Sequence, residues 1–153
     1  RVALIGFFDS VRGARASLDP SCELVGLCDI REELLSACRQ EDPGLFITND
    51  FREIAAMPGC DTVVTMTPNA THRDIAVACL RGGKNVFIEK PMGINLDQGR
   101  EILRVERESG KYVGVDLEFR FAAMTGQEAA KIIRSGEIGI SKHGEHTSER
   151  YSS

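Results

Sequence analysis

A regular alternation of short apolar runs and amphipathic segments constrains the fold of this chain more than any other feature. The apolar runs have the length and composition of buried strands, and they span residues 2–5, 24–28, 45–47, 62–66, 85–88 and 112–115. The segments between them, 11–18, 31–40, 51–57, 71–81 and 95–109, place their apolar residues on one face of a helix. Strands that alternate with helices build a parallel sheet covered by helices on both faces. The sequence therefore predicts an α/β fold with a doubly wound parallel sheet.

The alternation stops at Asp116, and this change divides the chain. We expect residues 1–116 to form one Rossmann-type domain, and residues 117–153 to be the start, or a remnant, of a C-terminal α+β domain. In the second part, Thr125 and Glu128 form a capping-box pattern that predicts a helix to about Arg134. The last stretch, 141–153, is polar, and its pattern fits an exposed strand as well as a disordered tail.

Composition narrows the classes of function. A net charge of −4 argues against nucleic acid and anionic membranes as partners, and no apolar run approaches the ~18 residues of a membrane span. We see no secretory signal pattern, and the five cysteines lack CxxC spacing, so we expect buried, reduced thiols in a cytoplasmic protein. We expect no metal site, because His72, His143 and His146 do not cluster with the cysteines in the sequence.

The turn after the first strand keeps only part of a dinucleotide-binding loop. Such a loop follows the pattern G-x-G-x-x-G/A, whereas this chain has Gly6-Phe7-Phe8-Asp9-Ser10-Val11. The second glycine lets the backbone approach a pyrophosphate, and Phe8 puts a large ring there. Val11 is bulkier than the third glycine, and Asp9 adds a negative charge that opposes phosphate binding. The loop is typical of a strand–turn–helix unit but is a poor phosphate site.

Asp29 ends the second strand, 23 residues after Gly6, close to the ~20 expected for a carboxylate that binds an adenosine ribose. Arg31, two residues later, suits stacking on an adenine or contact with a 2′-phosphate. The alternative is an ordinary aspartate that caps the next helix.

Two further segments follow strands four and five, where open α/β sheets bind ligands. The first is the turn Thr67-Pro68-Asn69, with His72 in the next helical turn; a cofactor contact and simple turn chemistry with a surface histidine both fit it. The second is Glu89-Lys90-Pro91, in which a lysine at the strand end is placed to polarise or protonate a substrate oxygen.

Taken together, these segments resemble the glucose–fructose oxidoreductase / inositol dehydrogenase / MocA (Gfo/Idh/MocA) family. The matching features are the start at residues 2–6, the end of strand two at 27–29, the Thr67-Pro68-Asn69 turn with His72, and Glu89-Lys90-Pro91; residues 118–121 and 132–139 look like the crossing into the family's second domain. The resemblance covers about residues 1–140.

The resemblance implies an oxidoreductase that uses NAD or NADP and acts on sugars, polyols or related small molecules. By this resemblance Lys90 is the catalytic residue, and Arg120 lies on the nicotinamide side of the cofactor. The residues that it implies as the lining of the cofactor come from all the segments above and are Gly6, Phe7, Phe8, Asp29, Arg31, Thr67, Pro68, Asn69, His72, Glu89, Lys90 and Arg120. Family members continue through a large antiparallel sheet that carries the substrate site, a second catalytic residue and the oligomer interface. This chain stops as that sheet should begin, and neither His143 nor His146 is a candidate for that residue.

Three functions follow from these observations. The first is the nucleotide-binding half of such an oxidoreductase, completed by further sequence or by another chain. The second is a non-catalytic Rossmann scaffold that has lost dinucleotide binding and serves in assembly or regulation, with Phe7 and Phe8 as a contact surface or a plug. The third is a site for another nucleoside-containing ligand, such as S-adenosylmethionine, which lacks a pyrophosphate. An unpaired edge left by the lost antiparallel sheet also predicts a homo-oligomer.

Overall fold

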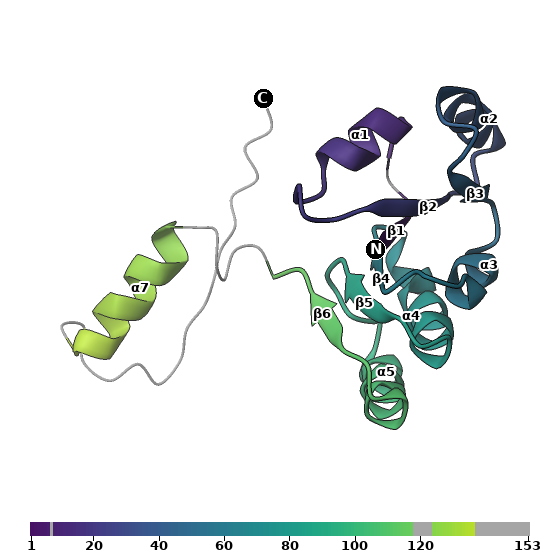
Figure 1. The fold of residues 1–153 in the computed structure, drawn as a ribbon. Coiled ribbons are helices and arrows are strands. Elements are labelled where there is room, and N and C mark those ends of the chain that lie inside the picture. Colours follow the sequence, from purple (N-terminus) through teal and green to yellow (C-terminus); the bar gives the residue numbers. More distant parts are fainter. Residues whose placement is uncertain (7, 118–123, 137–153) are drawn as a thin grey trace. The chain divides into compact units, whose positions relative to one another are not determined.

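A computed structural model describes residues 1–6, 8–117 and 124–136. Its centre is a six-stranded parallel sheet of order β3-β2-β1-β4-β5-β6, with the reversal of strand order between β1 and β4 (Figure 1). The strands are β1 (Val2–Ile5), β2 (Leu24–Cys28), β3 (Phe46–Thr48), β4 (Thr62–Thr65), β5 (Asn85–Ile88) and β6 (Val113–Val115). This order is that of a Rossmann sheet, so the predicted fold class is confirmed.

Helices follow most strands and begin or end at residues with the expected capping chemistry. They are α1 (Val11–Ala16), α2 (Glu32–Glu41), α3 (Phe51–Ala56), the short 3₁₀ helix η1 (Asn69–Thr71), α4 (His72–Arg81), α5 (Leu96–Ser109) and α7 (Met124–Ser135). The side chains of Asp50 and Asn95 cap α3 and α5 by accepting from backbone N–H groups at 2.9 Å. Gly110 closes α5 in the left-handed conformation, as a C-terminal glycine should.

Two apolar clusters cover the two faces of the sheet. The larger packs side chains of β1, β4 and β5 against α3, α4 and α5, with Ile54, Leu80 and Ile102 fully buried. The smaller packs β1 and β2 against α1 and α2, with Leu4, Leu27 and Leu35 at its centre. Among the described residues, this second cluster contains none from β5 or β6. Helices α1 and α2 therefore cover the β1–β2 side of that face only.

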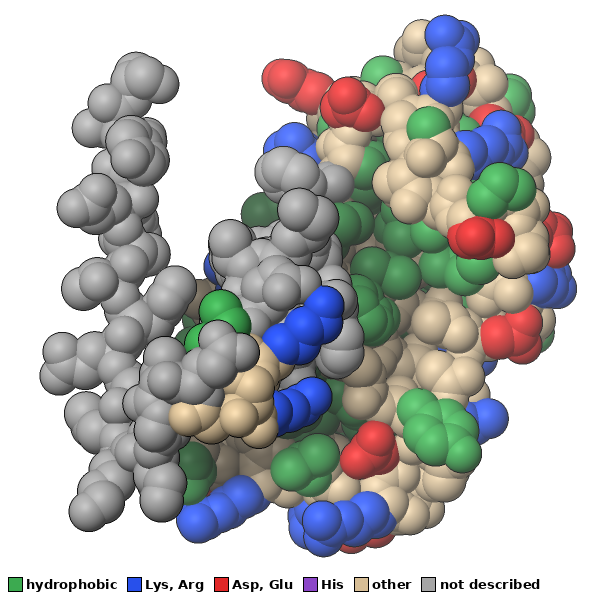
Figure 2. Space-filling model, turned by 90° about the vertical axis from the view of Figure 1, so that its left-hand side faces the viewer, with side chains coloured by type: hydrophobic (Ala, Val, Ile, Leu, Met, Phe, Trp, Pro, Cys, Tyr) green, Lys and Arg blue, Asp and Glu red, His purple; other side chains and the backbone are tan. Residues whose placement is uncertain are grey.

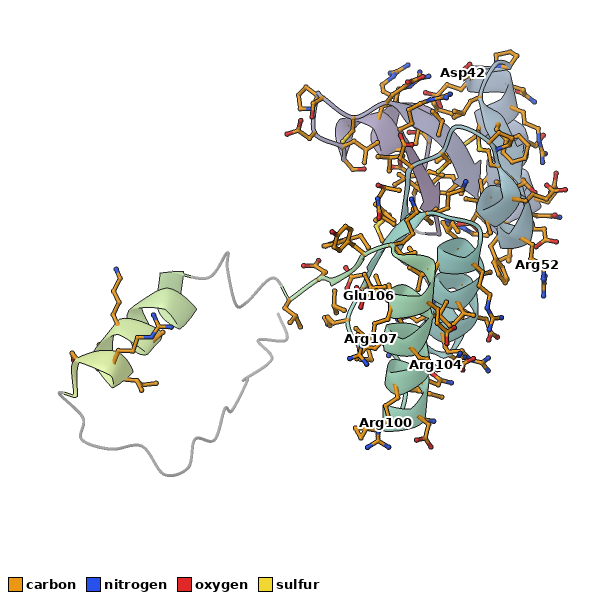
Figure 3. All side chains as sticks on the ribbon, turned by 60° about the horizontal axis from the view of Figure 1, so that its bottom comes forward. Asp42, Arg52, Arg100, Arg104, Glu106 and Arg107 are labelled. Atoms are coloured by element: carbon orange, nitrogen blue, oxygen red, sulfur yellow. The ribbon has the colours of Figure 1, made fainter. Side chains whose placement is uncertain are left out.

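The outer surface of α5 is charged. Arg100, Arg104 and Arg107 project from this helix (Figure 3), and Arg104 pairs with Glu108 at 2.6 Å. Glu106 on the same helix accepts a hydrogen bond from Val113 N at 2.9 Å, which ties the start of β6 to α5. The described helices include none that is long and apolar enough to cross a membrane.

The chain divides into two compact units, Arg1–Asp116 and Leu117–Ser153. In the second unit the described element is α7, the predicted helix that follows the capping-box pattern. Phe7, Arg120, His143 and His146 lie outside the described residues, so the expectations for them stay predictions.

The cysteines follow the expectation with one correction. All five are free thiols; Cys28, Cys38, Cys60 and Cys79 are buried, whereas Cys22 is exposed in the turn before β2. Burial raises the pKa of Cys28 and of Cys79 to about 12, so these two thiols stay protonated at neutral pH. The prediction of buried thiols was wrong for Cys22, because the polar turn Asp19–Glu23 keeps that residue at the surface.

Candidate nucleotide-binding site

A pocket of about 480 Å³ lies at the carboxyl ends of β1, β2 and β4, beside the reversal of strand order. Open α/β sheets bind nucleotides at this position. Its walls come from the strand ends, the turn after β4 and the first residues of α3, and they are mainly apolar: Ile5, Gly6, Cys28, Asp29, Ile30, Arg31, Asn49, Phe51, Met66, Thr67, Pro68, Thr71 and Ile75. The fold thus brings five of the predicted site residues to one pocket, namely Gly6, Asp29, Arg31, Thr67 and Pro68.

Gly6 is fixed by its surroundings as well as by its backbone. Its φ is +79°, and a Cβ atom added there would lie 2.7 Å from Thr67 Cγ2 and 2.9 Å from Met66 O. Only glycine fits such a position without strain. The first residue of the sequence pattern therefore keeps its structural role, a tight turn against the loop after β4.

Asp29 and Arg31 form a pair at the end of β2. Asp29 Oδ1 accepts from the backbone N and from Nε of Arg31, both at 2.9 Å, and Oδ2 accepts from Arg31 Nη2 at 2.7 Å. These hydrogen bonds from Arg31 are the main cause that lowers the pKa of Asp29. The structure unites the two alternatives for Asp29, because the carboxylate both lines the pocket and binds the backbone N–H two residues on.

The loop between β1 and α1 differs from a phosphate site in two respects: Phe8 is buried, and the N–H groups at the start of α1 bind other groups of this chain. Phe8 is buried, with 8% of its surface exposed, in the cluster beneath α1 and α2, and it also lines a second cavity of about 530 Å³. The carboxylate of Glu41, the last residue of α2, accepts from Val11 N and Arg12 N, both at 2.9 Å, and Ser10 Oγ accepts from Gly13 N at 2.9 Å. The first-turn N–H groups of α1, which bind the pyrophosphate in dinucleotide-binding proteins, are used inside this chain.

Sequence patterns gave no sign of Glu41. It lies 30 residues from Val11, in a helix whose periodicity marks its position as a solvent-facing one. The remaining pocket residues that sequence analysis did not single out, such as Phe51 and Met66, are ordinary apolar positions, and only the packing of the strand ends brings them together.

His72 connects the two loops that follow β4 and β5. Its side chain is fully buried; Nε2 lies 2.8 Å from Thr67 O, and Nδ1 lies 2.8 Å from Pro91 O. The alternative of a surface histidine was therefore wrong, because α4 begins at His72 and turns the ring into the protein. A direct contact between His72 and a cofactor stays a prediction.

Lys90 lies two residues after the end of β5, and its backbone N donates to Glu89 Oε2 at 3.1 Å. Its side chain is exposed, and the Lys90–Pro91 peptide bond is cis. Glu89 is held by its N–H, which donates to Thr65 O at 3.1 Å, so this turn lies next to the end of β4. Asn69 is exposed on η1. Within the described ranges, no three His, Cys, Asp or Glu side chains gather in a way that would hold a metal ion.

Comparison with known proteins decides the family. The model of the Gfo/Idh/MocA oxidoreductase family, described as an NAD-binding Rossmann fold, matches residues 1–117. The chain belongs to this family. The predicted resemblance is therefore confirmed for the Rossmann unit, and the turn Glu89-Lys90-Pro91 lies within the matched residues.

Curated proteins that are similar to this chain include dehydrogenases and a reductase whose names specify inositols or sugars. Scyllo-inositol 2-dehydrogenase (NAD(+)) of Bacillus subtilis is 32% identical over 92 residues, which are 60% of this chain and 27% of that protein. D-glucoside 3-dehydrogenase of Escherichia coli is 28% identical over 142 residues, which are 91% of this chain and 40% of that protein. This chain thus spans less than half the length of these two relatives.

Solved structures agree on the fold. The apo scyllo-inositol dehydrogenase from Lactobacillus casei superposes with a TM-score of 0.74 at 19% identity and covers 90% of this chain, which corresponds to 42% of that structure. A probable dehydrogenase from Thermotoga maritima gives a TM-score of 0.72 at 23% identity with the same coverage. At such identities the likeness establishes the family's fold and nothing finer.

Proposed function

We propose that this chain is the nucleotide-binding half of an NAD(P)-dependent oxidoreductase that acts on sugars, polyols or related small molecules. Membership in the Gfo/Idh/MocA family supports the class of reaction, and the activities named for the related inositol and glucoside dehydrogenases support the class of substrate. The observation that carries the proposal is the pocket at the ends of β1, β2 and β4, with Asp29 and Arg31 at one wall.

The described residues fit one part of the cofactor and not another. The adenosine part fits, because the pocket is apolar, has about 480 Å³ of space, and is bordered by a carboxylate–guanidinium pair. The pyrophosphate part does not fit, because Glu41 holds the N–H groups of α1 and Phe8 is packed into the core. When bound, a nicotinamide cofactor would supply the hydride acceptor or donor.

Lys90 is the residue of this chain that we assign to proton transfer. An ammonium group at the end of β5 is placed to hold a substrate oxygen and to pass a proton to or from it. The ring of His72 contacts Pro91 O in the turn that carries Lys90, and it contacts Thr67 O in the loop that lines the pocket. The same buried imidazole ring therefore positions both the turn of Lys90 and the wall of the pocket.

Calorimetric titration of the chain with NADH and with NADPH tests the proposal. We expect saturable heat with a Kd in the millimolar range or tighter. Absence of heat at millimolar concentrations of both cofactors would contradict the proposal.

A second function, a non-catalytic scaffold, is favoured by the contacts of Glu41. A chain whose α1 N–H groups are already satisfied needs no bound phosphate to complete its fold. The titration separates the two functions, since a scaffold would give no heat with either cofactor. Phe8→Gly with Asp9→Gly then tests whether the loop sequence alone is responsible.

A further inference from the structure

The corner of the pocket at the end of β2 presents a guanidinium to a ligand. The side chain of Asp29 is 5% exposed, whereas that of Arg31 is 55% exposed. Three hydrogen bonds from Arg31 already occupy the two carboxylate oxygens of Asp29. A ribose that bound through its 2′- and 3′-hydroxyls would have to compete with these bonds for the same oxygens.

Arg31 also reaches the loop after β1. Its Nη2 donates to Phe8 O at 3.0 Å as well as to Asp29 Oδ2 at 2.7 Å, so one side chain joins the end of β2 to the loop. Nε and Nη2 together carry three of the five N–H groups of a guanidinium, and the two on Nη1 are those that a further oxyanion would take. A phosphate oxygen accepts a short, charge-assisted hydrogen bond from such an N–H group.

The end of the pocket near the loop after β1 is unfavourable for a phosphate. A phosphate on the 5′-oxygen of an adenosine would face the loop of Phe8 and Asp9, and the nearest helical N–H groups already bind Glu41. No residue of α1 lines the pocket among the described residues. Charge and hydrogen-bonding capacity therefore favour a phosphate at the 2′ position over one at the 5′ position.

We propose that Arg31 makes this pocket selective for an adenosine that carries a 2′-phosphate, the group that distinguishes NADP from NAD. The proposal rests on the proposed nucleotide-binding function and goes further, because it names the ligand class and the residue that selects it. The Asp29–Arg31 pair is neutral as a whole, so Asp29 does not repel the phosphate as an unpaired carboxylate would.

Three small ligands test the proposal without the nicotinamide or the pyrophosphate. Adenosine, adenosine 2′-monophosphate and adenosine 5′-monophosphate are titrated into the full chain by calorimetry or by amide chemical shifts. The two monophosphates have the same size and charge, so they differ only in where the phosphate lies. We expect the 2′-monophosphate to bind about tenfold more tightly than the 5′-monophosphate, the effect of one charge-assisted contact.

Variants identify the residue responsible. Arg31→Ala should bring the ratio of the two dissociation constants close to one, and Arg31→Lys, which keeps the charge but not the planar guanidinium, should keep part of it. Arg31→Gln serves if the alanine variant fails to fold, as judged by circular dichroism. Arg104→Ala, which removes an exposed charge from α5, is the matched control and should leave the ratio unchanged, because no residue of α5 is among the described residues that line the pocket.

The outcomes separate the two proposals. Equal affinity for the monophosphates, or tighter binding of the 5′ form, with adenosine still bound, would overturn the role of Arg31 and leave the nucleotide pocket standing. No binding of any of the three ligands at millimolar concentration would contradict the nucleotide-binding function itself.

Discussion

At the scale of single residues, Gly6 is a position where space and backbone both exclude a side chain. Gly6→Ala should lower the free energy of unfolding by about 2–4 kcal/mol, because a methyl group would meet Met66 O in addition to the cost of a positive φ. Gly110 is the matched control: its φ is +66°, but no atom lies within 4 Å of an added Cβ. Gly110→Ala should cost about 1 kcal/mol. Equal losses in urea unfolding would contradict the role of the Met66 contact.

Asp29 gives a prediction about pH. Arg31 lowers the pKa of Asp29 in the folded chain, so the pair stabilises the fold above the unfolded value of about 3.9, and this stabilisation disappears as the pH falls through the lower folded pKa. At pH 7 we expect Asp29→Asn to melt a few degrees below the unchanged chain. The difference should shrink as the pH drops below about 4. A difference that stays constant between pH 7 and pH 3 would show that the charge of Asp29 is not responsible.

Individual site residues could be predicted from the sequence, but the contacts between them could not. Strand-end positions pointed to Asp29, Arg31 and Thr67, and all three line the pocket. The sequence did not reveal that Arg31 covers Asp29, because the choice between a free and a paired carboxylate depends on side-chain geometry. Nor did it reveal the burial of His72, since a histidine after a turn has the same local pattern at the surface or inside.

At the scale of elements, continuous apolar runs located every strand to within one or two residues, because strands buried on both faces leave a strong signal. The predicted helix ends were less accurate than the predicted strands. Helix α1 ends at Ala16 instead of the predicted Leu18, where Ser17 Oγ binds Ala14 O and the chain turns toward Asp19 and Pro20. The contact of α2 with α1 was not predictable, since residues 30 apart in sequence share no local pattern.

The capping of α1 by Glu41 can be measured directly. Glu41→Ala should speed the hydrogen exchange of the Val11 and Arg12 amides and lower the free energy of unfolding by about 1 kcal/mol, because two N–H groups lose their acceptor. Glu41→Gln should keep part of the protection through its one carbonyl oxygen. Gln40→Ala, one residue earlier on the exposed surface of α2, is the control and should change neither quantity.

At the scale of the whole molecule, the described helices of the unit Arg1–Asp116 cover one face of its sheet only in part. Phe87 alternates with the buried Val86 and Ile88 along β5 and therefore points to the face of α1 and α2, yet it is 42% exposed. On the face of the molecule that Figure 2 presents, several hydrophobic side chains lie next to one another at the surface. Such surface commonly marks an interface, which is in keeping with the prediction of a homo-oligomer.

Light scattering at several concentrations tests that prediction. We expect the chain to self-associate, and we expect Phe87→Asn to shift the equilibrium toward monomer with little change in melting temperature. Phe46, 40% exposed on the edge strand β3 at the other end of the sheet, supplies the control, and Phe46→Asn should leave the mass distribution unchanged. A monomer at all concentrations would refute the oligomer prediction.

The Glu41 contacts have a consequence for how mutations combine. Restoring glycine at positions 8 and 9 would remove the bulk and the charge of the loop, but the α1 N–H groups would still be bound to Glu41. Removing Glu41 alone would free those groups but leave the loop unable to approach a phosphate. The two changes should therefore show strong epistasis: each alone gains little affinity for a pyrophosphate, and only the combination opens a route back to it.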